Sequence, residues 1–116
     1  MAKENIIIDK TFEFSLRIID LYKYLTIEKK EYILSKQLLK SATSIGANVE
    51  EATAAQSRRD FLSKMSIASK EVRETTYWLR LLIKSNYITD NGILNNSIEI
   101  KKIITSIVKT TSAQKD

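Results

Sequence analysis

A seven-residue repeat of apolar side chains runs through the middle of this sequence and limits the folds open to it. Within residues 38–52 the apolar positions recur at spacings of 4, 3, 4 and 3, and they are Leu38, Ala42, Ile45, Val49 and Ala52. Residues 61–82 continue the rhythm with Phe61, Met65, Ala68, Val72, Thr75, Leu79 and Leu82. Such spacing keeps one narrow face of an α-helix apolar and is typical of the buried seam of a helical bundle. The sequence AAQSRRD between the two sets is short, so we expect the two helices to lie antiparallel as neighbours.

The segments on either side of this pair are also amphipathic. Apolar residues at helical spacing predict a first helix over about residues 10–26 and a last helix over about 90–110, followed by a polar, frayed C-terminus. The middle pair is predicted over about 29–55 and 58–85. Asp9 is a candidate N-cap of the first helix, and Ser57 with Asp60 resembles a capping box for the third.

The scarcity of chain-breaking residues favours an all-α fold. The sequence has no Pro and two Gly, which argues against an all-β chain full of tight turns. Its 116 residues suffice for one core but hardly for two. We therefore expect a single domain over residues 1–116 that forms an antiparallel up-down-up-down four-helix bundle.

One stretch of the second helix, SATSIGANVEEA at residues 41–52, is rich in small residues. Gly46 lies in its middle, and Gly inside a helix costs roughly 0.5–1 kcal/mol relative to Ala. Dispersion gained at a close helix–helix crossing would offset this cost. A phosphate-binding loop is not indicated, because its Gly-rich turn and following Lys are absent. We expect helix packing by the seam residues and their small neighbour, namely Ala42, Ile45, Gly46, Val49, Phe61 and Ala68.

The composition argues against several kinds of chemistry. Cys and His are both absent, which removes disulfides, thiol chemistry, the commonest general base and the commonest transition-metal ligand. We therefore expect no enzyme activity, no metal and no cofactor. The start, MAKENIIIDK, holds three consecutive apolar residues, and no segment approaches the roughly 18 that a spanning helix needs. We accordingly expect a cytoplasmic protein that does not bind a membrane.

Basic residues gather in the third predicted helix. The net charge is +5, and residues 58–84 hold seven basic and three acidic residues, so four of the five surplus charges fall in this segment. At spacings of 4, 3, 4, 3 and 4, one helix face, opposite the apolar seam, carries Ser66, Lys70, Arg73, Tyr77, Arg80 and Lys84. Four cations around a Tyr provide charge for phosphates and a ring for stacking, so Lys70, Arg73, Tyr77, Arg80 and Lys84 are the candidate nucleic-acid-binding residues. The alternative is a solvated outer face whose basic stems cover apolar surface.

Polar residues flank the seam on both middle helices. They are expected to form hydrogen bonds across helices or to remain solvated. Two specific expectations follow, a Glu51–Lys64 contact near the connecting sequence and a hydrogen-bond partner for the Trp78 N–H.

Residues 37–82, QLLKSATSIGANVEEATAAQSRRDFLSKMSIASKEVRETTYWLRLL, resemble the bacterial family of four-helix bundle proteins encoded in intervening sequences of 23S ribosomal RNA. The similarity is closest in SIGANVEEA and DFLSKMSIASKEVRETTYWLRLL, and the flanking helices match in placement only. The resemblance implies a homopentamer around a central channel. It also implies kinship with the accessory protein of diversity-generating retroelements, which associates with a reverse transcriptase and nucleic acid. The family offers no catalytic residues, and its motif positions correspond here to Ser44, Asn48, Glu51, Asp60, Phe61, Lys64, Lys70, Glu71, Glu74, Tyr77 and Trp78.

Two functions remain open on this reasoning. One is a non-enzymatic oligomer that binds RNA or DNA through the basic face. The other is a protein-interaction scaffold or accessory subunit, for example of a reverse transcriptase, with no nucleic-acid contact of its own. Self-association is expected in both cases, because the outer helices carry more apolar residues than one seam needs, including Tyr22, Tyr24, Ile103 and Val108.

Overall fold

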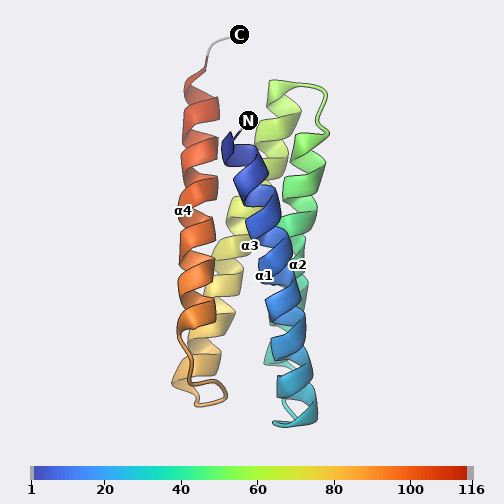
Figure 1. Cartoon of the computed structure of the whole chain (residues 1–116), viewed down its shortest axis with the longest axis vertical. Coiled ribbons are helices and arrows are strands. Elements are labelled where there is room, and N and C mark those ends of the chain that lie inside the picture. Colours follow the sequence, from blue (N-terminus) through green and yellow to red (C-terminus); the bar gives the residue numbers. More distant parts are fainter. Residues whose placement is uncertain (1, 115–116) are drawn as a thin grey trace.

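The chain folds into four antiparallel helices, as seen in a computed structural model that describes the backbone of residues 2–114 and the side chains of residues 6–114. The helices are α1 (Ala2–Ile27), α2 (Leu34–Thr53), α3 (Arg58–Lys84) and α4 (Gly92–Ala113). Each helix contacts two others, in the ring α1–α2, α2–α3, α3–α4 and α4–α1. The bundle measures 51 × 21 × 20 Å, and the α2–α3 connection lies at the end where α1 begins and α4 ends (Figure 1). This arrangement confirms the predicted all-α, up-down-up-down four-helix bundle.

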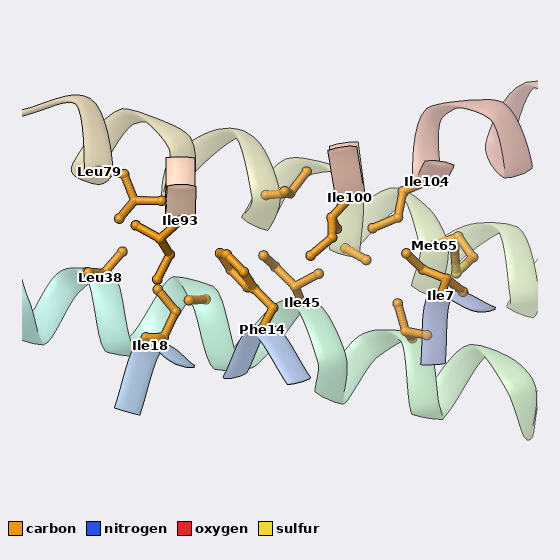
Figure 2. Close-up of a cluster of buried hydrophobic side chains, with 14 of the residues drawn as sticks. Ile7, Phe14, Ile18, Leu38, Ile45, Met65, Leu79, Ile93, Ile100 and Ile104 are labelled. Carbon is orange, nitrogen blue, oxygen red and sulfur yellow. The ribbon is translucent and has the colours of Figure 1, made fainter. Parts of the chain in front are cut away.

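The seam residues of the middle helices form the centre of the core. Leu38, Ile45, Met65 and Leu79 project into the space between the helices, where they meet side chains of α1 and α4 (Figure 2). The outer helices supply Ile7, Phe14, Ile18, Leu25, Ile93, Ile100, Ile104 and Ile107. The regularly spaced apolar side chains of the four helices therefore form one interior, as knobs-into-holes packing requires.

Helix α1 begins well before the predicted residue 10. It starts at Ala2, so Asp9 lies inside the helix and is not its N-cap. The side chain of Ile7 is only 1% exposed and belongs to the core. Continuing the helix through this residue places Ile7 one turn from Thr11 and two from Phe14, on the buried side of α1. Burial of Ile7 in the core favours a helix that starts before Asp9.

Helix α2 is shorter than the predicted range 29–55 and spans Leu34–Thr53. Lys30 has φ of 53°, in the left-handed region that a continuing right-handed helix does not allow. The chain therefore turns at residues 28–33 before α2 begins.

A buried carboxylate caps the start of α2. Glu31 is 8% exposed, and its two side-chain oxygens accept hydrogen bonds from the backbone N–H groups of Ile33 (3.1 Å), Leu34 (2.9 Å) and Ser35 (2.7 Å). Burial by itself raises the pKa of Glu31, but these N–H donors lower it by more, so the pKa lies below the ordinary value. A charged acceptor satisfies three N–H groups that a helix start leaves unpaired.

The boundaries of α3 match the predicted range 58–85 closely. The Oγ atom of Ser57 accepts a hydrogen bond of 3.0 Å from the N–H of Asp60, which is one half of the expected capping box. The helix ends in a Schellman motif around Asn86, whose φ is 69°. In that motif the N–H of Tyr87 donates to the carbonyl of Leu82 at 2.9 Å, and the N–H of Asn86 donates to the carbonyl of Ile83 at 3.1 Å.

Helix α4 is displaced by a few residues from the predicted range 90–110. It begins at Gly92, where Asp90 Oδ1 accepts a hydrogen bond of 2.8 Å from the N–H of that residue. It continues to Ala113, six residues beyond the buried Ile107. The frayed end predicted after residue 110 is thus helical as far as 113, and residues 115–116 lie outside the described part of the chain.

Gly46 marks the crossing of α2 with α1. A Cβ atom added at Gly46 would lie 3.5 Å from the Oγ atom of Ser15, 3.5 Å from the carbonyl oxygen of Thr11 and 3.6 Å from the Cβ of Thr11. The small-residue stretch is therefore a helix–helix contact, and its partner at Gly46 is α1. These distances are ordinary van der Waals contacts, so the crossing is close without excluding a methyl group.

Candidate nucleic-acid interface

The basic face of α3, defined here as Ser66, Lys70, Arg73, Tyr77, Arg80 and Lys84, is exposed along its whole length. It extends over roughly 27 Å at the α-helical rise of 1.5 Å per residue. Among the side chains of residues 6–114, its four cations form no ion pair with a carboxylate. Arg73 makes one long hydrogen bond, of 3.4 Å, from its guanidinium to the Oγ atom of Ser69. The positive charge of the face is thus available to a partner outside the chain.

The aromatic residue of the basic face has a fixed neighbour. Tyr77 is 51% exposed, and its ring packs edge to face with Trp78 at a centroid distance of 5.2 Å and an interplanar angle of 68°. Trp78 is half-buried against the core, and its Nε1 donates a hydrogen bond of 3.4 Å to Glu74 Oε2. The partner expected for the Trp78 N–H is therefore present. Anchoring of the indole limits the motion of the Tyr77 ring, which suits a ring that stacks on a base.

Acidic side chains lie on one side of the basic face only. Thr76 faces α4, because its hydroxyl is in hydrogen-bond contact with the hydroxyl of Ser97. Glu71 and Glu74 precede Thr76 by five and two residues, which places them roughly 140–160° away around the helix axis. The edge of the basic face that borders α4 therefore carries no carboxylate from α3 between residues 66 and 84.

That edge opens into a groove between α3 and α4, which the sequence did not predict. The groove encloses about 500 Å³ and is lined by Thr76, Arg80, Ile83, Lys84, Asn91, Leu94, Asn95 and Ile98. Its side chains are apolar or neutral polar apart from Arg80 and Lys84. Three smaller grooves elsewhere on the bundle each contain at least one carboxylate. Finding the α3–α4 groove requires the register between two helices, and no single-helix pattern contains that information.

The remaining predicted residues divide between the core and the surface. Five of the six helix-packing residues are buried, and Phe61 is half-buried against them. The family-motif residues of α2 bond within their own helix: Ser44 Oγ donates to the carbonyl of Lys40 at 2.8 Å, and Asn48 Nδ2 donates to the carbonyl of Ser44 at 2.9 Å. Asp60 is exposed at the start of α3.

The expected Glu51–Lys64 contact is not formed. Within residues 6–114 the ion pair present joins Lys10 Nζ to Glu99 Oε2 at 3.3 Å, between α1 and α4. Glu51 is exposed near the end of α2, where solvation of a free carboxylate competes well with a surface ion pair. The prediction was wrong because surface pairs contribute too little energy to hold two long side chains together.

An apolar stripe on α1 forms a second surface feature. Phe12 (60% exposed), Leu16 (45%) and Ile27 (66%) point outward, with Ile8 and Ile19 half-buried between and beside them. We call these five residues the α1 stripe. Helical spacing alone does not tell how wide the buried part of a face is, so the sequence does not distinguish the exposed Phe12 and Leu16 from the buried apolar residues of α1.

Two further classes of site are not found in the described residues. Nowhere in residues 6–114 do three His, Cys, Asp or Glu side chains come together in a way that could hold a metal ion. No helix within residues 2–114 combines the length and the apolar character needed to cross a membrane.

This chain matches one family model and is similar to a solved crystal structure. The family model described as 23S rRNA-intervening sequence protein matches residues 3–109. A crystal structure from Bacteroides thetaiotaomicron, of a protein with unknown function from the S23 ribosomal protein family, is 54% identical in sequence. The match covers 92% of this chain and 98% of that one, with a TM-score of 0.90. No curated protein matches the sequence.

Proposed function

Because this chain belongs to the family of 23S rRNA-intervening sequence proteins, we propose that it is a non-enzymatic oligomer that binds RNA or DNA through the basic face of α3. The observation that carries this proposal is the set of four exposed cations that make no ion pair within the described chain. These cations extend over roughly 21 Å of helix, from Lys70 to Lys84, so one polyanion such as a nucleic-acid backbone could contact several of them.

Contact with phosphates has a defined thermodynamic signature. Each phosphate that a Lys or Arg neutralises releases condensed counterions, so the binding constant falls as salt rises. The exposed Tyr77 adds a stacking surface beside this charge, and stacking tolerates any base. The proposed binding is therefore strongly salt-dependent and only weakly selective for sequence.

Fluorescence anisotropy with a labelled, structured RNA over a range of KCl concentrations tests the proposal. The expected result is saturable binding, and the logarithm of the binding constant should fall linearly with the logarithm of the salt concentration. Absence of binding at low salt, for RNA and DNA alike, would instead support the second candidate function, a protein-interaction scaffold or accessory subunit, for example of a reverse transcriptase.

The α1 stripe supports the oligomeric part of the proposal and is also the observation that favours the second candidate. The stripe follows one face of α1 for roughly 29 Å, from residue 8 to residue 27, and its exposed members are Phe12, Leu16 and Ile27. A group of exposed apolar side chains of this kind is typical of a protein contact. In a ring of more than two subunits, a different surface of the neighbouring copy would cover the α1 stripe, because such a contact is heterologous. Five subunits is the number that the sequence resemblance implies, and we propose it for the assembly.

A further inference from the structure

The α3–α4 groove continues the basic face onto a second helix. Thr76 and Ser97 meet across the two helices, which sets their relative height. Leu94 and Asn95 line the groove, and Lys101 and Lys102 follow them by seven residues, or about two turns. Because seven residues return an α-helix to nearly the same side, these two exposed lysines lie on the side of α4 that lines the groove, at about the height of Arg73. Cations of both α3 and α4 thus lie along the groove and its continuation between the two helices.

The opposite side of α4 has a different character. Glu99 points toward α1, where it pairs with Lys10, and Asn96 lines the groove between α1 and α4. Glu99 is one turn from Asn95 along α4, and its ion pair with Lys10 directs the carboxylate toward α1 rather than over the α3–α4 groove. The charges around the groove, on both helices, are complementary to a polyanion.

The interior of the groove suits a flat, partly apolar group. Ile83, Leu94 and Ile98 provide apolar walls, and the amide side chains of Asn91 and Asn95 lie beside them. Within the described residues, neither amide side chain makes a hydrogen bond. Asn amides can donate to and accept from the edges of bases, and the volume of about 500 Å³ falls within the usual range of small-ligand pockets.

We propose that this groove binds single-stranded nucleic acid, with one unstacked base between Ile83, Leu94 and Ile98. Asn91 and Asn95 hydrogen-bond the edge of that base. Arg80, Lys84, Lys101 and Lys102 contact the phosphates on either side. This proposal rests on the proposed function and adds to it a preference for single strands, because the bases of a duplex are stacked and paired and cannot enter the groove.

Three labelled 15-nucleotide probes of equal backbone chemistry separate binding of the base from binding of the phosphates. They are a base-bearing single strand, an abasic single strand and a duplex. The wild-type protein should bind the base-bearing strand about tenfold more tightly than the abasic strand, as stacking of one base allows. Asn95→Ala should weaken binding of the base-bearing strand and leave the abasic strand unchanged. Gln37→Ala, on the exposed side of α2, removes an amide elsewhere and should change neither.

The phosphate contacts of α4 are tested by Lys101→Glu/Lys102→Glu. This variant should weaken binding of both single strands at least tenfold, whereas Lys36→Glu/Lys40→Glu, with the same charge change on exposed positions of α2, should have little effect. Equal binding of base-bearing and abasic strands, or a duplex bound as tightly as the single strand, would overturn the groove proposal and leave backbone binding by α3 intact. Failure of all three probes to bind would overturn the proposed function as well.

Discussion

The Oγ1 atom of Thr75 on α3 lies 2.9 Å from the Oγ atom of Ser41 on α2, and this hydrogen bond joins two buried side chains. It lies among apolar seam residues, and each hydroxyl also lies near a backbone carbonyl of its own helix: Thr75 Oγ1 is 2.8 Å from the oxygen of Glu71, and Ser41 Oγ is 3.3 Å from the oxygen of Leu38. The pair fixes which turn of α2 faces which turn of α3.

A double-mutant cycle on this pair should show coupling. We expect Thr75→Val to destabilise the fold by about 1–2 kcal/mol, because it leaves the buried Ser41 hydroxyl with a weaker set of partners. The double variant Ser41→Ala/Thr75→Val should lose less than the sum of the single variants. Urea unfolding at one fixed protein concentration measures the three free energies. Additivity within about 0.3–0.5 kcal/mol would show that the two hydroxyls do not depend on each other.

Gly46 should tolerate a methyl group but not a larger side chain. Gly46→Ala adds a Cβ that makes ordinary contacts with Ser15 and Thr11, and it removes the helix-propensity cost of Gly. The expected result is a gain in stability of up to about 1 kcal/mol. Gly46→Leu should instead destabilise the protein, since a branched side chain has to displace α1. Thermal unfolding of both variants measures the effect, and a destabilised Ala variant would mean that α1 and α2 lie closer than the structure indicates.

Capping by Glu31 predicts a pH-dependent contribution to stability. Its pKa is lowered in the folded protein by the N–H donors of α2, so the charged form stabilises folding above the ordinary Glu pKa of about 4.3. This contribution is lost as the pH falls from that value through the lowered pKa of the folded state. Glu31→Gln should therefore cost about 1 kcal/mol at pH 7 and progressively less on acidification. Urea unfolding of both proteins from pH 7 to pH 3 provides the comparison, and a difference that grows toward low pH would contradict the cap.

The α1 stripe should govern self-association. Phe12→Glu/Leu16→Glu places two carboxylates in the exposed stripe and should convert the proposed oligomer to a monomer, because burial of an unpaired charge opposes assembly. Both side chains already point to solvent in the single chain, so the helical circular dichroism should be unchanged. Light scattering after size exclusion gives the mass. Ile67→Glu, at an exposed apolar position of α3, serves as the control, and an unchanged mass for the α1 variant would place the subunit contact elsewhere.

Much of this fold follows from the sequence because helical spacing reports directly on faces. Leu38, Ile45, Val72 and Leu79 are assigned to the interior by a repeat that has one physical interpretation. The start of α1 was missed because Asp9 matches an N-cap in pattern, whereas burial of Ile7 depends on what the other helices offer.

The cap of α2, the α1 stripe and the α3–α4 groove were harder to predict, because each depends on contacts that a single-helix pattern does not contain. Capping of α2 by Glu31 uses a long side chain from the preceding turn and has no short motif of its own. The sequence does not predict the exposure of Phe12 either, since an apolar residue looks the same in sequence whether its own chain or another copy covers it. The basic face of α3 could be read from spacing, but the groove beside it needs the position of α4.

The most direct test of nucleic-acid binding by the basic face compares salt dependence between two double variants. Lys70→Glu/Arg73→Glu alters the face outside the α3–α4 groove, and Lys36→Glu/Lys40→Glu makes the same charge change on α2. Affinity for one structured RNA is measured at several KCl concentrations. The account predicts that the α3 variant binds at least tenfold more weakly and that its log–log salt slope is smaller than the wild-type slope by about two, one for each lost phosphate contact, while the α2 variant keeps the wild-type slope. Equal slopes and affinities for the two variants would contradict it.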